Sequence, residues 1–264
     1  MIEIEATSPS ENAHLVASSL PDIGTVTFAD LGHALRAGAF DFRTAPRFGV
    51  FFSAVYVLGG FLMVWLGAGT VVWTLAVSLG FPLVPPFAAA GLYEVSRRLE
   101  QGERLTWEGV LGVVWRERTR QLPWAGAIIV IYFLFYTFLA HMIFALFMGL
   151  SPMTNVSSGW DAFLTRQGLT VVAVEFAVGG VLAFLLYALT VVSLPLLLDR
   201  ELDFVSAMIL SFNVVAQNPV TMGAWALLIA VTTLLALVPW FLGLVVVLPV
   251  LGHATWHLYR RALS

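Results

Sequence analysis

Six long apolar stretches constrain this sequence more than any other feature. A helix needs about 20 consecutive, mostly apolar residues to cross the hydrocarbon core of a bilayer. Hydrophobic residues make up 59% of the chain and charged residues 11%, against about 45–50% and about 25% in soluble domains. We therefore expect an all-α integral membrane protein with about six transmembrane helices. They are predicted over residues 48–66, 71–92, 125–148, 169–198, 220–238 and 241–259.

Prolines modify three of these predicted helices. The fourth stretch is longer than a bilayer requires, and Pro195 is expected to bend or end its helix. The fifth and sixth stretches are separated by little more than Pro239 and Trp240, which predicts a tight hairpin. The prolines at 82, 85 and 86 should interrupt the second helix, and a packing kink is favoured there over a broken, substrate-binding helix.

All thirteen basic residues are arginines, and their distribution predicts the orientation of the chain. Twelve precede the first stretch, lie between the second and third, or follow the fourth and sixth, whereas Arg166 alone lies on the other side. Cytoplasmic connections carry the excess of basic residues in membrane proteins. We therefore expect a multi-pass protein of the bacterial inner membrane with both termini cytoplasmic. Residues 1–25 are predicted to be a polar cytoplasmic tail, and residues 26–264 a single transmembrane domain.

The sequence also contains a probable internal repeat of three units, residues 30–98, 107–200 and 203–261. Each unit begins with a short segment that precedes a proline and an apolar stretch; these segments cover residues 30–42, 107–120 and 203–217. The first two are amphipathic, which is typical of helices in the headgroup region, and the third is apolar nearly all round. We expect three helical hairpins, each preceded by a short interfacial helix.

Two of the returning helices share a frame of residue types. A proline, an aromatic residue, a polar residue and an arginine pair recur at identical offsets in residues 86–98 and 249–261. Aromatic and basic residues are common where any helix leaves a membrane, so this frame alone leaves the repeat as a prediction. The matched positions are Pro86, Tyr93, Glu94, Arg97 and Arg98 in the first segment and Pro249, Trp256, His257, Arg260 and Arg261 in the second.

Two motifs resemble a known bacterial family. The first is Ala34-Leu-Arg-Ala-Gly-Ala-Phe-Asp-Phe followed by Pro46, and the second runs from Pro86 through Gly-Leu-Tyr-Glu-x-Ser-Arg-Arg to Glu103. In these motifs the chain is similar to the family catalogued as domain of unknown function 2189, over roughly residue 25 to the end. The resemblance implies an integral inner-membrane protein and carries no established activity and no catalytic residues.

Glu175 and His141 are the clearest candidates for a site within the membrane. Ionisable side chains in a membrane helix are costly, so each is a functional candidate. His141 precedes the outer end of the third stretch by about eight residues, and Glu175 follows the outer start of the fourth by about seven. Antiparallel neighbours would place them at similar depth. The pair is interpreted either as a proton or cation relay or as a structural interhelical contact.

The polar ends of the returning helices are candidate contacts for lipid headgroups. Headgroup anchoring is the general interpretation, and a specific phosphate or lipid site between the two ends is the sharper one. His253 and His257 have the i, i+4 spacing of a metal-binding pair, but no third ligand is evident, so no metal and no cofactor is predicted. The candidate residues are Tyr93, Arg97, Arg98, Trp256, His257, Arg260 and Arg261.

The function predicted from these features is that of a non-enzymatic accessory or assembly subunit of a larger membrane complex, such as a respiratory or photosynthetic one. The sequence lacks cysteine, phosphate-binding loops and hydrolase motifs, which argues against an enzyme. The expected partners are membrane lipids and other membrane-protein subunits, and no basic patch suggests nucleic acid. The alternative is a transporter or channel for a small molecule or ion that uses Glu175 and His141.

Overall fold

The computed structural model describes residues 21–65, 84–149 and 164–263. For residues 63 and 64 it describes the backbone alone. This part of the chain is helical, apart from an isolated antiparallel bridge between Ile23 and Leu263. Its helices are α1 (Phe28–Thr44), α2 (Pro46–Trp65), α4 (Val84–Glu100), α5 (Trp107–Glu117), α6 (Leu122–Met148), α8 (Arg166–Thr190), α9 (Ser193–Asp199), α10 (Phe204–Gln217), α11 (Pro219–Leu237) and α12 (Leu244–Ala262).

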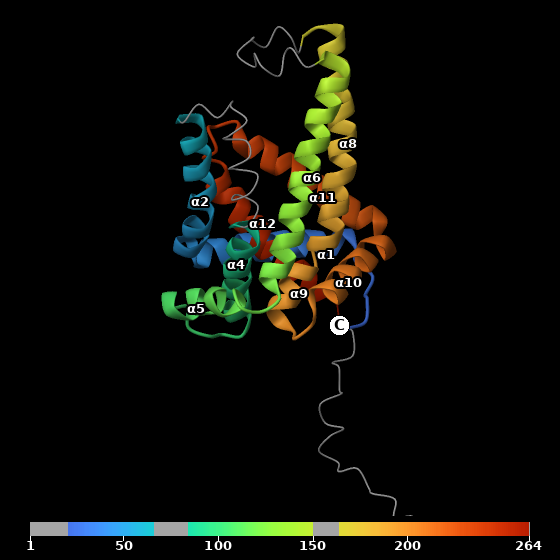
Figure 1. Ribbon diagram of the computed structural model, residues 1–264. Coiled ribbons are helices and arrows are strands. Elements are labelled where there is room, and N and C mark those ends of the chain that lie inside the picture. Colours follow the sequence, from blue (N-terminus) through green and yellow to red (C-terminus); the bar gives the residue numbers. More distant parts are fainter. Residues whose placement is uncertain (1–20, 66–83, 150–163, 264) are drawn as a thin grey trace, which may run out of the picture.

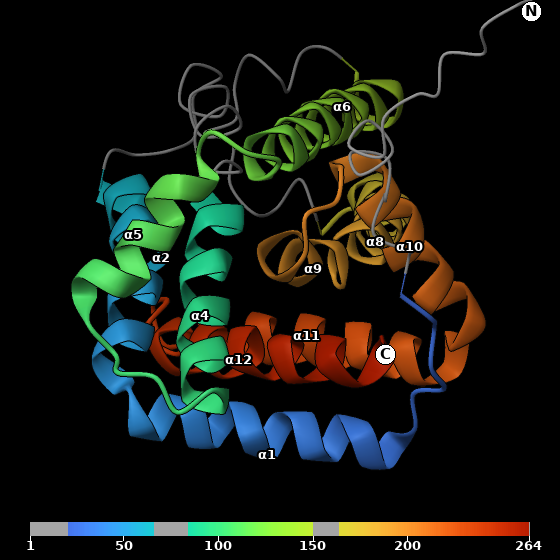
Figure 2. The same cartoon turned by 90° about the horizontal axis from the view of Figure 1, so that it is seen from below.

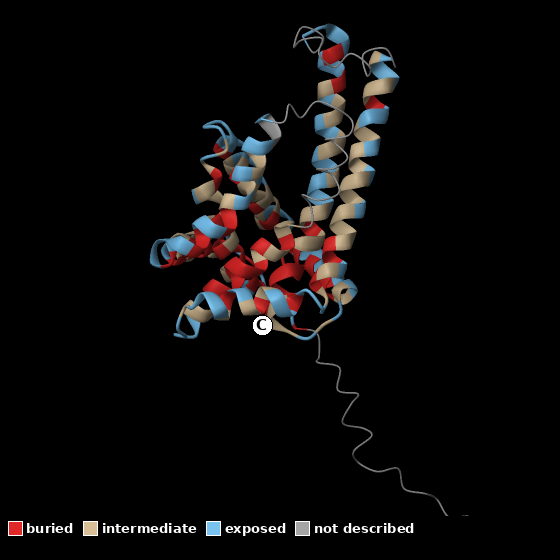
Figure 3. Cartoon of the chain, turned by 60° about the vertical axis from the view of Figure 1, so that its left-hand side comes forward, coloured by how far each residue is buried: buried red, intermediate tan, exposed pale blue. Residues whose placement is uncertain are grey.

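The helices form a base layer from which longer helices rise (Figure 1). α1, α5, α9 and α10 lie in the base, and α2, α6, α8 and α11 extend from it toward one side. The returning helices α4 and α12 end in the base, where α12 lies along α1 (Figure 2). Most buried residues are in this layer, whereas the α6–α8 hairpin is largely exposed above it (Figure 3). The base therefore supplies the tertiary core of the described chain.

Polar caps and prolines explain where the base helices begin and end. Thr27, Thr106 and Asp203 each accept a hydrogen bond from a backbone N–H in the first turn of α1, α5 and α10, which satisfies a donor that the helix itself leaves free. α2 and α11 begin at Pro46 and Pro219. Proline suits the first turn of a helix because its missing N–H is not needed there.

The predicted interfacial helices correspond to α1, α5 and α10. α1 meets α2 at a bend of 100°, so a helix lying in the base is followed directly by one that rises from it. α10, which is apolar nearly all round, buries one face against the other helices, whereas Val205, Ile209 and Phe212 on its outer face are exposed. The order of short helix, rising helix and returning segment follows the predicted repeat, which itself stays a prediction.

Three helices of the described chain are long and apolar enough to cross a membrane, and up to four if the bent pair α1 and α2 counts as one span. The three are Leu122–Met148, Arg166–Asp199 and Pro219–Leu237, which correspond to the third, fourth and fifth predicted stretches. Most of the second stretch lies outside the described residues. The sixth corresponds to α12, which is not among these three helices. It is extensively buried against α1, α2 and α4. Six spans are thus not established by these helices alone.

Serine side chains bind backbone groups near two prolines that lie within apolar helical segments. Pro195 cannot donate to the carbonyl four residues earlier, and the helix breaks there between α8 and α9 as predicted. At this break Ser211 donates to the Ala188 carbonyl at 2.7 Å and accepts from the Val192 N–H at 3.1 Å. Buried backbone groups in a membrane protein need such partners. The break is therefore a stable feature of the packing.

Pro249 is accommodated in a similar way inside α12. Its ring leaves the Val245 carbonyl without its helical donor, and the Ser53 hydroxyl from α2 lies 3.4 Å from that oxygen. The expected break in the second stretch has a different outcome, because Pro85 and Pro86 lie in the first turn of α4, where proline is well tolerated. Pro82 lies outside the described residues.

Both ends of the described chain meet on the base. Gly24 N–H donates to the Ala262 carbonyl at 2.9 Å, next to the bridge between Ile23 and Leu263. The buried side chain of Asn218, between α10 and α11, accepts from the Val26 N–H at 2.8 Å and donates to the Gly24 carbonyl at 3.2 Å. The start of the domain is thus fixed to its end.

Candidate functional site

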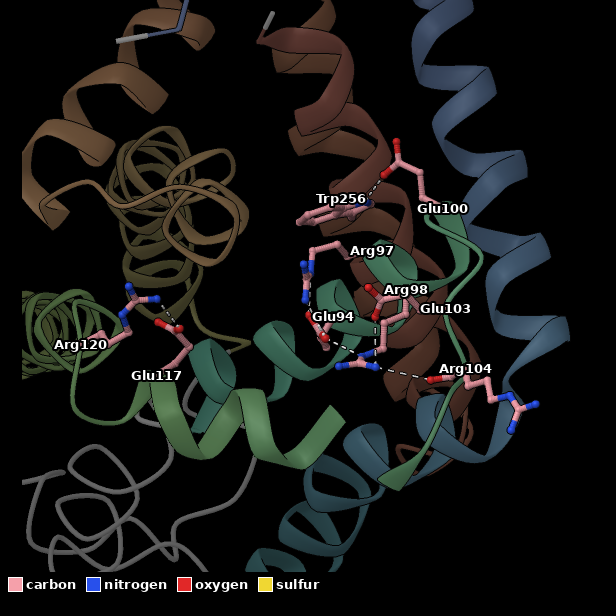
Figure 4. Close-up of polar contacts among 9 residues, drawn as sticks. All are labelled: Glu94, Arg97, Arg98, Glu100, Glu103, Arg104, Glu117, Arg120 and Trp256. Carbon is pink, nitrogen blue, oxygen red and sulfur yellow. Dashed lines mark hydrogen bonds and ion pairs between the residues drawn. The ribbon is translucent and has the colours of Figure 1, made fainter. Parts of the chain in front are cut away.

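A buried carboxylate on α4, that of Glu94, is the centre of the polar network in the base (Figure 4). Its side chain has no exposed surface. Arg97 contacts both carboxylate oxygens, at 2.7 and 2.9 Å, and Arg98 contacts one of them at 2.6 Å. The hydrogen bonds to Glu94 hold the pKa of the Arg97 guanidinium above its ordinary value. One buried negative charge thus holds two arginines, and the three groups together carry a single positive charge.

The helical spacing brings these groups together, since residues three and four apart share a face. Arg98 also pairs with Glu103 at 3.2 Å and reaches the Arg104 carbonyl, which fixes the loop after α4. One turn earlier, α4 approaches α2 at Gly91, where a Cβ would lie 2.0 Å from the Phe52 ring. Close packing of α4 on α2 therefore requires glycine at this position.

A second set of contacts ties the end of α12 to α4 and α9. Trp256 Nε1 donates to Glu100 at 3.1 Å, and Arg260 pairs with the same carboxylate at 3.3 Å. The Tyr259 hydroxyl donates to Asp199 at 2.7 Å. Because these carboxylates belong to α4 and α9, the polar end of α12 connects the first and second predicted units of the chain.

Two histidines of α12 have separate partners. His257 Nε2 lies 2.7 Å from the carboxylate of Asp41 on α1, and His253 Nδ1 lies 2.8 Å from the Ser96 hydroxyl of α4. Asp41 is buried, and His253 is completely so. No group of three or more metal-binding side chains occurs among residues that the structure describes. The pair at i, i+4 thus has structural partners from two different helices.

The residues predicted to contact headgroups divide into two classes. Tyr93 and Trp256 are 5% and 1% exposed, and their ring centroids are 6.4 Å apart inside the protein. In this conformation neither ring can touch a lipid, which corrects the expectation for both aromatics. The remaining members are partly exposed on the base, and each lies beside a carboxylate: Arg97, Arg98, His257, Arg260 and Arg261.

The register of the α6–α8 hairpin places His141 near the level of Glu175. The Tyr132 hydroxyl donates to the Leu182 carbonyl at 2.6 Å, and Tyr136 packs against Gly179. Antiparallel helices keep this register, so His141 is level with residue 173 or 174, one or two residues from Glu175. The two side chains interact electrostatically. No direct hydrogen bond joins them in the described structure, because His141 Nδ1 is bound at 2.7 Å to the Thr137 carbonyl.

Several residues of the network were not singled out from the sequence. Their only signal was a carboxylate within a stretch of arginines or within one of the quoted motifs, which does not say which arginine each will meet. The contacts connect residues up to 231 positions apart. These residues are Asp30, Asp41, Ser96, Glu100, Glu117, Asp199 and Glu201.

Comparison with known families finds a match over part of the chain. A family model described as "Predicted integral membrane protein (DUF2189)" matches residues 74–199. This segment belongs to the DUF2189 family. The match covers α4, α5, α6, α8 and α9, and includes Glu94, Arg97 and Arg98. It confirms the resemblance to DUF2189 and the general class of integral membrane protein. No curated protein and no solved structure matches the chain.

Proposed function

We propose that this DUF2189 protein is a non-enzymatic accessory or assembly subunit of a larger membrane complex, and that the α6–α8 hairpin meets the partner. The observation that carries the proposal is the low burial of the hairpin. Only 11% of an apolar 18-residue segment of α6 is buried within the chain. The hairpin extends beyond the base layer and away from α2 (Figure 1). Another chain can therefore pack against it without rearrangement.

One face of α8 suits a partner helix. Helices in lipid associate where small residues let their backbones approach closely. Gly179 faces Tyr136 within the hairpin, whereas a Cβ at Gly180 would meet no atom within 4 Å. Ala173 and Ala177 are exposed on α8 as well. α8 thus uses one glycine inside the hairpin and leaves its neighbour available on an outward face.

The experiment is co-purification of the tagged protein at native expression in a mild detergent, followed by mass spectrometry. A stoichiometric partner with the native chain, lost in Gly180→Leu, supports the proposal. Gly223→Leu on α11 is the matched control, because Gly223 also has open space around it. Purification of the native chain without any partner, or equal loss in both variants, would contradict the proposal.

We also infer that the protein lies in the bacterial inner membrane with the base on the cytoplasmic side. Two observations support this orientation. The arginine-rich ends of α4, α5 and α12 are in the base, whereas Arg166 begins α8 at the far end of the hairpin. The described ends of the chain are joined on the base, so the number of crossings is even. We propose six crossings arranged as three hairpins.

A second candidate function is transport of a proton or cation by Glu175 and His141. Their electrostatic contact across the hairpin favours it. The test is proton flux into liposomes that contain the purified protein, measured with a pH-sensitive dye. Flux in the native chain that is lost in Glu175→Gln supports transport. An absence of flux in the native chain, or flux that Glu175→Gln leaves unchanged, contradicts this role.

A further inference from the structure

A groove between α4, α5 and the end of α9 contains charges of both signs. Its volume is about 570 Å³, and it is lined by side chains from segments far apart in the sequence. Three arginines and three glutamates contribute to it, so its formal charge is balanced. The charged lining residues are Glu94, Arg97, Arg116, Glu117, Arg120 and Glu201.

The arginines of the groove are not equivalent. Arg97 is held by Glu94, and Arg120 pairs with both Glu117 and Glu201. Arg116 pairs with no carboxylate in the described chain, although it lines the same groove. Arginine binds phosphate oxygens through several N–H donors at once. Arg116 is therefore the one arginine of the groove that can bind an anion without giving up an ion pair.

Glu117 supplies the opposite charge. Its side chain is 6% exposed, and its ion pair is with Arg120 at 3.3 Å. Arg120 is shared with the exposed carboxylate of Glu201. A buried carboxylate with one long contact is poorly compensated for its loss of water. A small cation with N–H donors would therefore be stabilised beside Glu117, next in sequence to Arg116.

The groove lies at the depth of lipid headgroups. Trp107, Leu111 and Trp115 form one exposed face of α5, four residues apart. Trp124 is 61% exposed in the first turn of α6. Exposed tryptophans of membrane proteins are concentrated at the interface between acyl chains and headgroups, and α5 has the outline of an interfacial amphipathic helix. The ligand that matches this setting is a lipid, in preference to a soluble phosphate compound.

We propose that this groove binds the headgroup of an aminophospholipid, with the phosphate at Arg116 and the primary ammonium group beside Glu117 and Glu201, the carboxylates that Arg120 also contacts. The arrangement selects a zwitterion, because a second negative charge would face the glutamates. It also selects a primary ammonium over a quaternary one, since only the former donates hydrogen bonds to carboxylates. The site is separate from the hairpin face assigned to a partner subunit, so either proposal can fail alone.

The test is native mass spectrometry of the purified full chain titrated with phosphatidylethanolamine, phosphatidylcholine and phosphatidylglycerol. The native chain should retain phosphatidylethanolamine most strongly. Arg116→Gln should weaken binding of phosphatidylethanolamine and phosphatidylcholine alike by about tenfold, the usual effect of losing a charged hydrogen bond. Glu117→Gln should instead remove the preference for phosphatidylethanolamine over phosphatidylcholine.

Arg118→Gln is the matched control, because the Arg118 guanidinium stacks 3.3 Å over the Trp115 ring and does not line the groove. It should bind lipid as the native chain does. If Glu117→Gln fails to fold, Glu201→Gln tests the same preference with an exposed carboxylate. Equal retention of all three lipids, equal effects of Arg116→Gln and Arg118→Gln, or displacement of the lipid by millimolar phosphoethanolamine alone would overturn the proposal; the last would assign the groove to a soluble ligand.

Discussion

Single carboxylates in the base join helices that the sequence keeps far apart. Glu94 is more enclosed than these carboxylates, but its partners Arg97 and Arg98 lie on its own helix, α4. Asp41 and Glu100 connect α12 to α1 and α4 through His257 and Arg260. A buried ion pair is costly to break because the remaining charge is left without a partner and partly without water. These contacts therefore explain why the base is a defined layer.

Replacing Glu94 by Gln should destabilise the protein by about 2–4 kcal/mol, because two partly buried arginines lose their shared carboxylate. The matched control is Glu103→Gln, which removes an ion pair from the same Arg98 at a half-exposed position. It should cost less than about 1 kcal/mol. Unfolding of the purified proteins in mixed detergent micelles measures both free energies. Equal losses in the two variants would show that burial of Glu94 contributes nothing.

At Gly38, α1 lies so close to the backbone of α12 that even a methyl side chain would clash. A Cβ there would lie 2.5 Å from the backbone nitrogen of Ala254 and 2.6 Å from the Val250 carbonyl oxygen. Gly38→Ala should therefore separate α1 from α12 and cost about 1–3 kcal/mol. Gly32→Ala on the same helix meets no atom within 4 Å and should stabilise by up to about 1 kcal/mol. Melting temperatures that move in the same direction would refute this packing.

Helix lengths separate the elements into those that fit a bilayer and those that fit its surface. α6 and α8 contain 27 and 25 residues, which correspond to about 40 and 38 Å and exceed the hydrocarbon thickness of about 30 Å. α5 and α10 have 11 and 14 residues, too few to cross. Hydrophobic length thus explains why α6 and α8 form the tall hairpin and why the short helices remain in the base.

The sequence patterns predicted the helices better than they predicted the contacts between helices. Apolar length, amphipathic pattern and prolines predicted α1, α5, α6, α8, α10 and α11, because these signals act within a few residues. The burial of α12 was missed, since a stretch as apolar as a membrane span can equally pack against protein. The partners of Glu94 were close in sequence, but those of His257 and Arg261 depend on how α1 meets α12. Such distant pairings have no local signal.

The N-cap of α10 predicts a pH dependence at the scale of one helix. The Ser206 backbone N–H donates to Asp203 at 2.9 Å and lowers the pKa of that carboxyl below its ordinary value. The ionised cap therefore stabilises the folded protein above the unfolded pKa, and this contribution is lost as the pH falls through the folded pKa. Asp203→Asn keeps a capping oxygen but has no charge to titrate.

The comparison is the unfolding free energy of the native chain and of Asp203→Asn from pH 7 to pH 3. The native chain should be the more stable at pH 7, and the difference should shrink on acidification. The control is Asp22→Asn at an exposed position before α1, which should leave the native pH dependence unchanged. A difference in unfolding free energy that stays constant over this range would show that the charge of Asp203 does not stabilise α10.

At the scale of the whole molecule, we propose an arginine-rich base from which hairpins cross the membrane and return. The joined ends of the chain, the arginines in the base and the exposed apolar hairpin all support this arrangement. It places Leu164 beyond the membrane, next to the start of α8, and Gln101 on the cytoplasmic side after α4. Leu242, at the turn between α11 and α12, should be on the same side as Leu164.

The most direct test uses the absence of cysteine from the sequence. Single variants Leu164→Cys, Leu242→Cys and Gln101→Cys are exposed in intact bacterial cells to a maleimide that cannot cross membranes. The account predicts labelling of the first two in intact cells and of Gln101→Cys only after permeabilisation. Labelling of Gln101→Cys in intact cells would contradict the orientation, and protection of Leu242→Cys before and after permeabilisation would contradict a third crossing hairpin.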